Sequence, residues 1–217
     1  MRTDRAVMLS VALVVTAFAV SLIFYDSFPE RVPMHWNADG VADRTVAKPW
    51  GPFVSPLVMA GMLALFLVLP RISPRGYEIE PFRRSYDILQ LGLIAFIFLV
   101  NLVVLLNALG FPIPMSRLLP VGLGLLFALI GNFLGKVTVN FFVGIRTPWT
   151  LADPEVWLRT HRFAGRLFVA VGLGMAVCGL LGVASHWLLA AALLLCVAPA
   201  AYSYVVYSRL NDHRPPA

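Results

Sequence analysis

The sequence has little charge and few residues of the kinds that build soluble catalytic or metal centres. Only 13% of its 217 residues are charged, and it contains four histidines and two cysteines. Both cysteines, Cys178 and Cys196, fall inside apolar runs, where neither a disulfide framework nor a zinc site is expected, so we interpret them as packing residues. The motifs of metalloproteases, serine hydrolases and phosphate-binding loops are also absent. These absences argue against a soluble enzyme.

Long apolar segments are what the sequence has in abundance. Hydrophobic residues make up 59% of the chain, against roughly 45–50% in a soluble domain, and the mean hydropathy is +0.82. A transmembrane helix needs about 17–25 mostly apolar residues. Six segments meet this requirement: 6–25, 53–69, 88–109, 118–134, 167–183 and 187–207. We therefore predict an all-α integral membrane protein, a bundle of about six transmembrane helices whose first span is a retained anchor and not a cleaved signal peptide.

The basic residues predict the orientation, because cytoplasmic flanks carry an excess of Lys and Arg. With the N-terminus inside, all but four of the 17 basic residues fall on the cytoplasmic side; the exceptions are Arg31, Arg44, Lys48 and Arg117. The N-terminus and the C-terminus are thus both expected to be cytoplasmic. Orientation accounts for the positive net charge, so we expect no direct nucleic-acid partner. Two longer connections stand out: an outer loop, 26–52, and an inner loop, 135–166.

The outer loop combines turn residues with polar side chains. Asn37 and Gly40 bound a segment that favours a turn. His35, Asp39 and Asp43 are of types that bind metals or transfer protons, but their spacing matches no zinc or calcium pattern, so we predict no metal and no cofactor. The candidate ligand-binding residues of this loop are His35, Trp36, Asn37, Gly40 and Asp43.

Polar residues also mark the start of the inner loop. Asn132, Lys136 and Asn140 are spaced i, i+4 and i+8, so any helix here carries them on one face. Such a face suits a cavity or contacts with other helices. Alternatively, Lys136 extends to the membrane interface and the two asparagines hydrogen-bond neighbouring helices.

The second half of the inner loop carries a helix start. Asp153, Pro154 and Glu155 supply an N-cap acceptor, a first-turn proline and a favourable negative charge. We predict a short helix from Pro154 toward the fifth span, with Trp157 at headgroup level. No carboxylate falls inside a predicted span, which argues against a proton-coupled pump.

The most specific pattern is the run Gly144-Ile145-Arg146-Thr147-Pro148-Trp149-Thr150-Leu151, together with the polar residues before it and Trp157, Thr160, His161, Arg162 and Gly165 after it. This pattern closely resembles the signature of the SdpI-type bacterial immunity family. The outer segment with Pro33, His35-Trp36-Asn37, Gly40 and Asp43 resembles the DUF1648 region that precedes it in many members of that family.

The resemblance implies two regions: residues 1–70, DUF1648-like, with two transmembrane helices and the outer loop, and residues 71–217, SdpI-like, with four transmembrane helices and the inner loop. It implies a multi-pass protein of the bacterial cytoplasmic membrane, without catalytic activity, that gives resistance to a secreted membrane-active peptide toxin. In the best-known family member the protein also holds a cytoplasmic repressor at the membrane. The candidate partner-binding residues of the inner motif are Asn132, Lys136, Asn140, Gly144, Arg146, Thr147, Pro148, Trp149, Trp157, His161 and Arg162.

Three alternatives stay open. Gly144 to Leu151 also fits a purely structural re-entry of the chain, in which Pro148 sets φ and Arg146 anchors carbonyls or lipid phosphates. The chain also fits a small-solute transporter or channel that uses the Asn132, Lys136 and Asn140 face, or a membrane scaffold. Gly131 and Gly135 form a small-residue pair that favours close helix packing, within one chain or between two copies.

Overall fold

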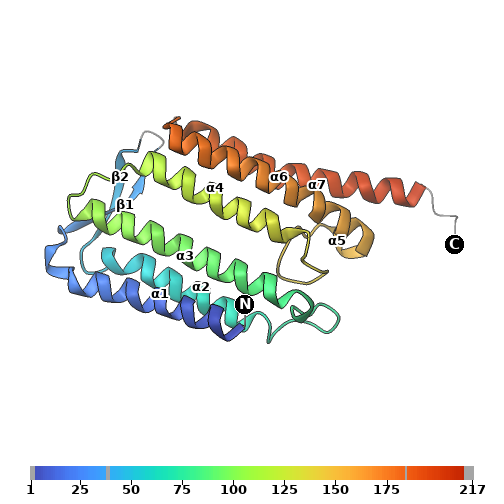
Figure 1. The fold of residues 1–217 in the computed structure, drawn as a ribbon, viewed down its shortest axis with the longest axis horizontal. Helices are drawn as coiled ribbons and strands as arrows, with labels where there is room; N and C mark the ends of the chain where they lie inside the picture. The colour runs from blue at the N-terminus through green and yellow to red at the C-terminus, as the bar shows by residue number, and fades with distance from the viewer. Residues whose placement is uncertain (1–2, 38–39, 184, 213–217) are drawn as a thin grey trace.

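Six long helices lie side by side in the structure, a computed structural model that describes residues 3–37, 40–183 and 185–212 (Figure 1). They are α1 (Thr3–Ile23), α2 (Val54–Val68), α3 (Arg83–Ala108), α4 (Met115–Leu134), α6 (Pro154–Leu181) and α7 (Leu188–Asp212). Each, with its adjoining turns where present, is long and apolar enough to cross a membrane. The predicted all-α bundle of six membrane-spanning helices is therefore confirmed.

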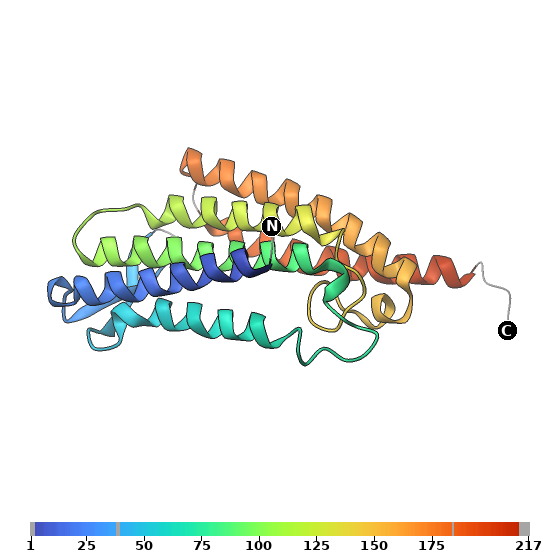
Figure 2. The same cartoon turned by 60° about the horizontal axis from the view of Figure 1, so that its bottom comes forward.

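The two ends of the bundle differ. One end, called here the hairpin end, carries the antiparallel strands β1 (Arg31–Trp36) and β2 (Ala42–Ala47). The other, called the α5 end, carries the segment between α4 and α6 with the short helix α5 (Pro148–Ala152). The chain enters α1 and leaves α7 at the α5 end (Figures 1 and 2). Which end faces the cytoplasm stays a prediction.

The helices form two groups of three. Helices α1, α2 and α3 pack on one another around Val14, Met59 and Ile94. Helix α6 packs on both α4 and α7, and α3 and α4 join the two groups. Large apolar side chains such as Leu180 and Leu189, 69% and 70% exposed, cover the outside. Such a surface fits a hydrocarbon solvent and not water.

The closest contact in the bundle lies between α4 and α6. A Cβ added at Gly172 would lie 2.5 Å from the carbonyl oxygen of Gly124, and one added at Gly131 would lie 2.6 Å from that of Gly165. The two glycines of each helix are seven residues apart, so the helices meet glycine to glycine at two points: Gly124 against Gly172 and Gly131 against Gly165. Without a hydrophobic driving force in lipid, such backbone-to-backbone packing is a main source of helix association.

Helix α3 begins earlier than the sequence predicted, and its first turns hold a buried carboxylate. Its first residue is Arg83, and it is preceded by the 3-10 turn Glu80–Phe82, so the apolar candidate span includes Asp87. Asp87 is 1% exposed and pairs with Arg83, Nε to Oδ1, at 3.0 Å. The predicted span 88–109 itself contains no carboxylate, but the helix that carries it begins five residues earlier and holds this buried one.

Other local expectations also change. The short helix predicted at Pro154 and the fifth span are one continuous helix, α6, capped by Asp153, whose side chain accepts from the N–H of Glu155 and Val156. Residues 31–47, expected to be a turn in a loop, form a hairpin. Cys196 is exposed on α7 and is not a core packing residue, whereas Cys178 is partly buried.

The contact between α4 and α6 makes a prediction about two glycines of α6. Gly172→Ala should lower the free energy of unfolding by about 1–3 kcal/mol, because the new methyl group meets backbone that has no room to move. Gly174 has no heavy atom within 4 Å of an added Cβ, so Gly174→Ala should be neutral or stabilising, by up to about 1 kcal/mol from helix propensity. Thermal unfolding of both variants in detergent measures the difference. An equal loss of stability in Gly172→Ala and Gly174→Ala would contradict the close contact between α4 and α6 at Gly172.

Candidate functional site

The hairpin end holds the residues predicted in the outer loop. The side chain of Asn37 accepts from the N–H of Val41 at 2.9 Å, and the N–H of Gly40 donates to the carbonyl of Asn37 at 2.9 Å, so the predicted turn chemistry is present. Gly40 has φ +78°, which favours glycine, and an added Cβ would lie 3.0 Å from Ser116 of α4. Asp39 lies outside the described residues. The hairpin is thus tied closely to the start of α4.

His35 and Asp43 form an ion pair across the hairpin. His35 Nδ1 lies 2.5 Å from Asp43 Oδ1, and both side chains are exposed. The hydrogen bond from His35 lowers the pKa of Asp43 below its usual 3.8. An exposed pair of this kind links the two strands but contributes little to stability, and it encloses no substrate. Among the described residues there is no cluster of three metal-binding side chains.

A cavity of about 380 Å³ lies beside the hairpin. Its walls come from the half-buried Trp36 and the exposed Asn37, from the start of α4, and from the start of α7. The α4 wall includes Met115 and Ser116, and the α7 wall includes Leu189. The cavity therefore combines an aromatic ring and aliphatic walls with a few polar groups, the usual composition of a ligand pocket. His35 and Asp43 do not line it.

At the α5 end, the predicted polar helix face does not form. Helix α4 ends at Leu134 with Gly135 as its C-cap, so Lys136 and Asn140 lie beyond it. Asn140 is completely buried and makes four hydrogen bonds: Nδ2 donates to the carbonyls of Thr138 and Val143, and Oδ1 accepts from the N–H of Phe142 and Val143. The side chain of Asn140 therefore gives these backbone N–H and C=O groups the hydrogen-bond partners that a helix or strand would otherwise give them.

A second set of contacts fixes this segment to α6. Nε2 of His161 accepts from the N–H of Ile145 at 3.0 Å, and Nδ1 donates to the carbonyl of Trp157 at 2.8 Å. The ring is therefore neutral, because one nitrogen accepts from a backbone N–H. The rings of His161 and Trp157 stack with centroids 4.0 Å apart, and the indole N–H donates to Val137 at 2.8 Å. Trp157 is 2% exposed and so is buried within the protein, while its place at headgroup level stays a prediction.

Gly144 explains why these contacts are possible. Its φ is +114°, and a Cβ at this position would collide with the imidazole ring of His161. Only glycine fits both the backbone conformation and the space. Gly144 thus lies against His161, in the segment whose backbone Asn140 and Trp157 also bind. The side chains of Asn140, Trp157 and His161 are buried, so none of these three is exposed to a partner.

The run from Arg146 to Trp149 begins α5. Thr147 caps the helix and forms a capping box with Thr150, and its hydroxyl hydrogen-bonds Ser203 of α7 at 2.9 Å. Trp149 packs on Tyr204 of α7, with ring centroids 5.1 Å apart. Arg146 and Pro148 are exposed, and Arg146 donates to the carbonyl of Phe141. The short helix α5 was not predicted, because five residues are too few for a hydropathy signal.

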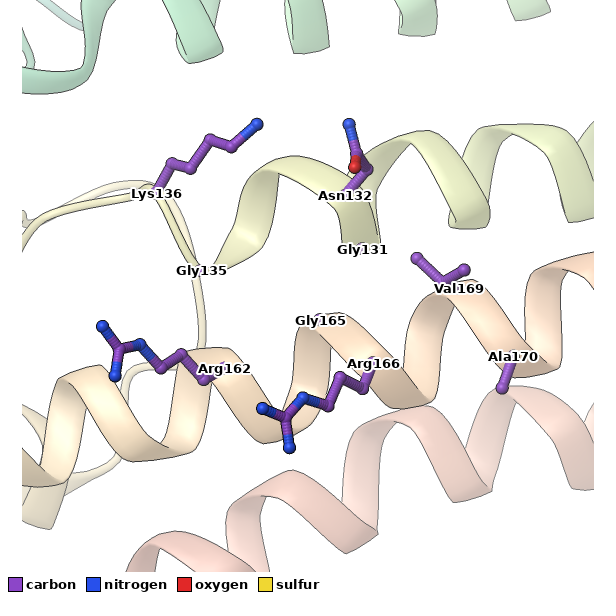
Figure 3. Close-up of a pocket in the computed structure, with 9 residues that line it drawn as sticks. All are labelled: Gly131, Asn132, Gly135, Lys136, Arg162, Gly165, Arg166, Val169 and Ala170. Atoms are coloured by element: carbon purple, nitrogen blue, oxygen red, sulfur yellow. The ribbon is translucent and has the colours of Figure 1, made fainter.

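A groove of about 590 Å³ lies between α4 and α6 near the α5 end (Figure 3). Gly131, Gly135 and Gly165 lie between the helices, while Asn132 and Lys136 extend from the α4 side, and Arg162 and Arg166 from the α6 side. All four of these side chains are exposed. Arg166 and the three glycines were not among the predicted site residues, although the i, i+4 spacing of Arg162 and Arg166 was visible in the sequence.

The chain matches known families in both regions. Residues 136–204 match the model of the SdpI/YfhL protein family, and residues 12–60 match a domain of unknown function, DUF1648. The Immunity protein SdpI of Bacillus subtilis (strain 168) is 31% identical over 169 residues, which cover 78% of this chain and 79% of the relative. No solved structure matches. The matched regions include both strands of the hairpin and residues 136–153.

The two asparagines near the groove should respond differently to substitution. Asn140→Ala leaves buried backbone groups without partners, and each such group costs about 1–3 kcal/mol, so we expect a lower unfolding temperature and faster proteolysis of the 135–153 segment. Asn132→Ala removes an exposed side chain and should change neither. Thermal unfolding and limited proteolysis of the two variants test this. A stable Asn140→Ala protein with an intact segment would show that the asparagine is not structural.

The ion pair of the hairpin makes a prediction about titration. In His35→Ala the pKa of Asp43 should rise toward 3.8, because the hydrogen bond that lowers it is lost. Since the folded pKa is lowered, the pair stabilises the hairpin fully above pH 3.8 and loses this effect as the pH falls through the lower value. A titration of the Asp43 carboxyl carbon followed by NMR measures this pKa in the intact protein and in His35→Ala. Glu78, whose pKa is lowered by the N–H of Gly76, is the control and should not change.

Proposed function

The chain belongs to the SdpI/YfhL protein family, and from this membership we propose that it is an immunity protein that protects a bacterium against a secreted, membrane-active peptide. It is a multi-pass protein of the bacterial cytoplasmic membrane. The observation that carries the proposal is the identity of 31% to Immunity protein SdpI, which extends over 78% of the chain. A protein embedded in the membrane is placed where such a peptide acts.

In this proposal the cavity at the hairpin end receives part of the peptide. Trp36 supplies a large, half-buried aromatic surface, and Asn37 supplies polar groups at the edge. Aromatic side chains in such positions commonly carry most of the binding energy of an interface. The wall from α7, with Leu188 and Leu189, would accept an apolar side chain. His35, Gly40 and Asp43 would keep the hairpin in the conformation that forms the cavity wall.

The α5 end would then face the cytoplasm, as the distribution of basic residues predicts. There, Arg146, Pro148 and the partly exposed Trp149 form a surface beside α7, to which a cytoplasmic protein such as a transcriptional repressor would bind. Arg and Trp favour such contacts because they combine planar hydrogen bonding with a large contact area. The buried Asn140, Trp157 and His161, with the adjoining Gly144, would support this surface from within.

A transport function has one specific observation in its favour. Asp87 is buried in α3, its Oδ2 has no partner among the described residues, and Gln90 one turn further donates to Ser10 of α1 at 3.4 Å. Ionisable groups inside a membrane span often serve proton or ion movement. Against this, Asp87 already pairs with Arg83, so we place the transporter second.

The cavity can be tested by protection. Trp36→Ala and Leu189→Gln should each lower the peptide concentration that cells survive by roughly 10–30-fold, the effect of losing about 1.4–2 kcal/mol at a central contact. Survival of a sensitive bacterium that expresses each variant at matched membrane levels is the measurement. Trp50→Ala is the matched control, because Trp50 is 68% exposed and lies outside the cavity.

Three outcomes would redirect the proposal. Equal protection by the Trp36→Ala, Leu189→Gln and Trp50→Ala variants would remove the cavity from peptide binding. No protection by the intact protein against a panel of membrane-active peptides would contradict immunity itself. Proton flux into vesicles that is present in the intact protein and lost in Asp87→Asn would favour the transporter.

A further inference from the structure

The groove between α4 and α6 carries positive charge that the protein does not neutralise. Lys136, Arg162 and Arg166 border it, and in the part of the chain that the structure describes no carboxylate pairs with any of them. Arg159, on the same helix, pairs with Glu155 at 2.6 Å. Arg162 and Arg166 lie one turn apart, where like charges repel each other. An anion from outside the chain would reduce the repulsion among these three cations, so the groove favours the binding of an anion.

The floor of the groove lets a ligand come close to the backbone. Gly131 and Gly165 are buried in the close contact between the two helices, and with Gly135 they leave the floor of the groove without side chains. Polar and charged side chains border the groove on both sides: Asn132 and Lys136 on the α4 side extend away from α6, and Arg162 and Arg166 extend from α6 away from α4 (Figure 3). Arg side chains bind phosphate oxygens through two parallel N–H donors, and Lys adds a compact charge.

The lining changes from charged to apolar along α6. After Arg162 and Arg166 come Val169 and Ala170, about one turn further toward the middle of the helix. The helix is apolar enough to span a membrane, so this direction leads from the membrane surface into the hydrocarbon. The same order, phosphate first and hydrocarbon next, is the order of groups in a phospholipid. A free phosphate ion would use only the charged part.

We propose that this groove binds the headgroup of an anionic phospholipid, with one phosphate near Lys136 on one border, another near Arg162 and Arg166 on the other, and the start of an acyl chain against Val169 and Ala170. A lipid with two phosphates suits the cations on both borders better than a lipid with one. Basic pockets between transmembrane helices near the cytoplasmic surface are a common setting for such binding. The proposal does not depend on the immunity function.

Native mass spectrometry of the full chain in detergent tests the proposal. Titration with cardiolipin, phosphatidylglycerol and phosphatidylcholine should show binding in that order, with cardiolipin at least tenfold tighter than phosphatidylcholine. Soluble glycerol phosphate, added in excess, should not displace cardiolipin. Equal binding of phosphatidylcholine would overturn the proposal. Displacement by glycerol phosphate would show that the site takes a phosphate anion and not a lipid.

Two triple variants locate the site. Lys136→Gln/Arg162→Gln/Arg166→Gln should weaken cardiolipin binding by about 125-fold, since each of the three basic residues near a membrane surface contributes roughly fivefold, or about 1 kcal/mol. The matched control, Arg71→Gln/Arg75→Gln/Arg84→Gln, removes the same charge at the same end of the bundle, outside the groove, and should have little effect. Equal weakening in both would overturn the groove as the site.

A charge-preserving variant guards against a folding defect. Arg162→Lys/Arg166→Lys keeps both charges and loses only the paired donors, so it should bind cardiolipin less than fivefold more weakly than the intact protein. The substituted side chains are exposed, so all variants should unfold at the same temperature as the intact protein. Binding by the Lys variant as weak as by the Gln variant, at unchanged stability, would contradict phosphate recognition through charge.

Discussion

The backbone contact between α4 and α6 determines the positions of the other features at both ends of the molecule. Because Gly124 and Gly131 face Gly172 and Gly165, the two helices approach more closely than any side chain would allow. Their ends are consequently fixed. At the hairpin end α4 supplies a wall of the cavity beside Trp36, and at the α5 end the 135–153 segment must turn back within a short distance. The groove between the helices is a direct result, since glycines leave its floor without side chains.

The 135–153 segment shows how an irregular chain is stabilised at the end of a bundle. Non-helical backbone near lipid must find its hydrogen-bond partners within the protein. Asn140 supplies four of these bonds, the ring of His161 supplies one to Ile145, and the indole of Trp157 donates one to Val137. Much of the motif that resembles the family signature therefore has a structural explanation. The predicted inner-motif residues whose side chains are left exposed for partners are Asn132, Lys136, Arg146, Pro148 and Arg162; Gly144 is exposed but has no side chain.

Hydropathy was sufficient to predict the six spans, because each must be apolar over the thickness of the bilayer. It could not place their ends, which capping and local packing decide, and so Asp87 was missed inside α3. The spacing of Asn132, Lys136 and Asn140 predicted a shared face only on the assumption that the helix continues, and Gly135 ends it. The groove brings Lys136 together with Arg162 and Arg166 through the contact of two helices, which no local pattern in the sequence encodes.

The two ends of the bundle have different roles in the proposed function, with recognition of the peptide at the hairpin end. Site-specific photo-crosslinking tests it most directly. A photoreactive residue at Leu189, on the cavity wall, and another at Phe141, exposed at the α5 end, would be compared in cells challenged with the peptide against which the protein protects. The account predicts a covalent adduct with the peptide at position 189 and none at 141. An adduct at 141 alone would contradict it and place recognition at the opposite end.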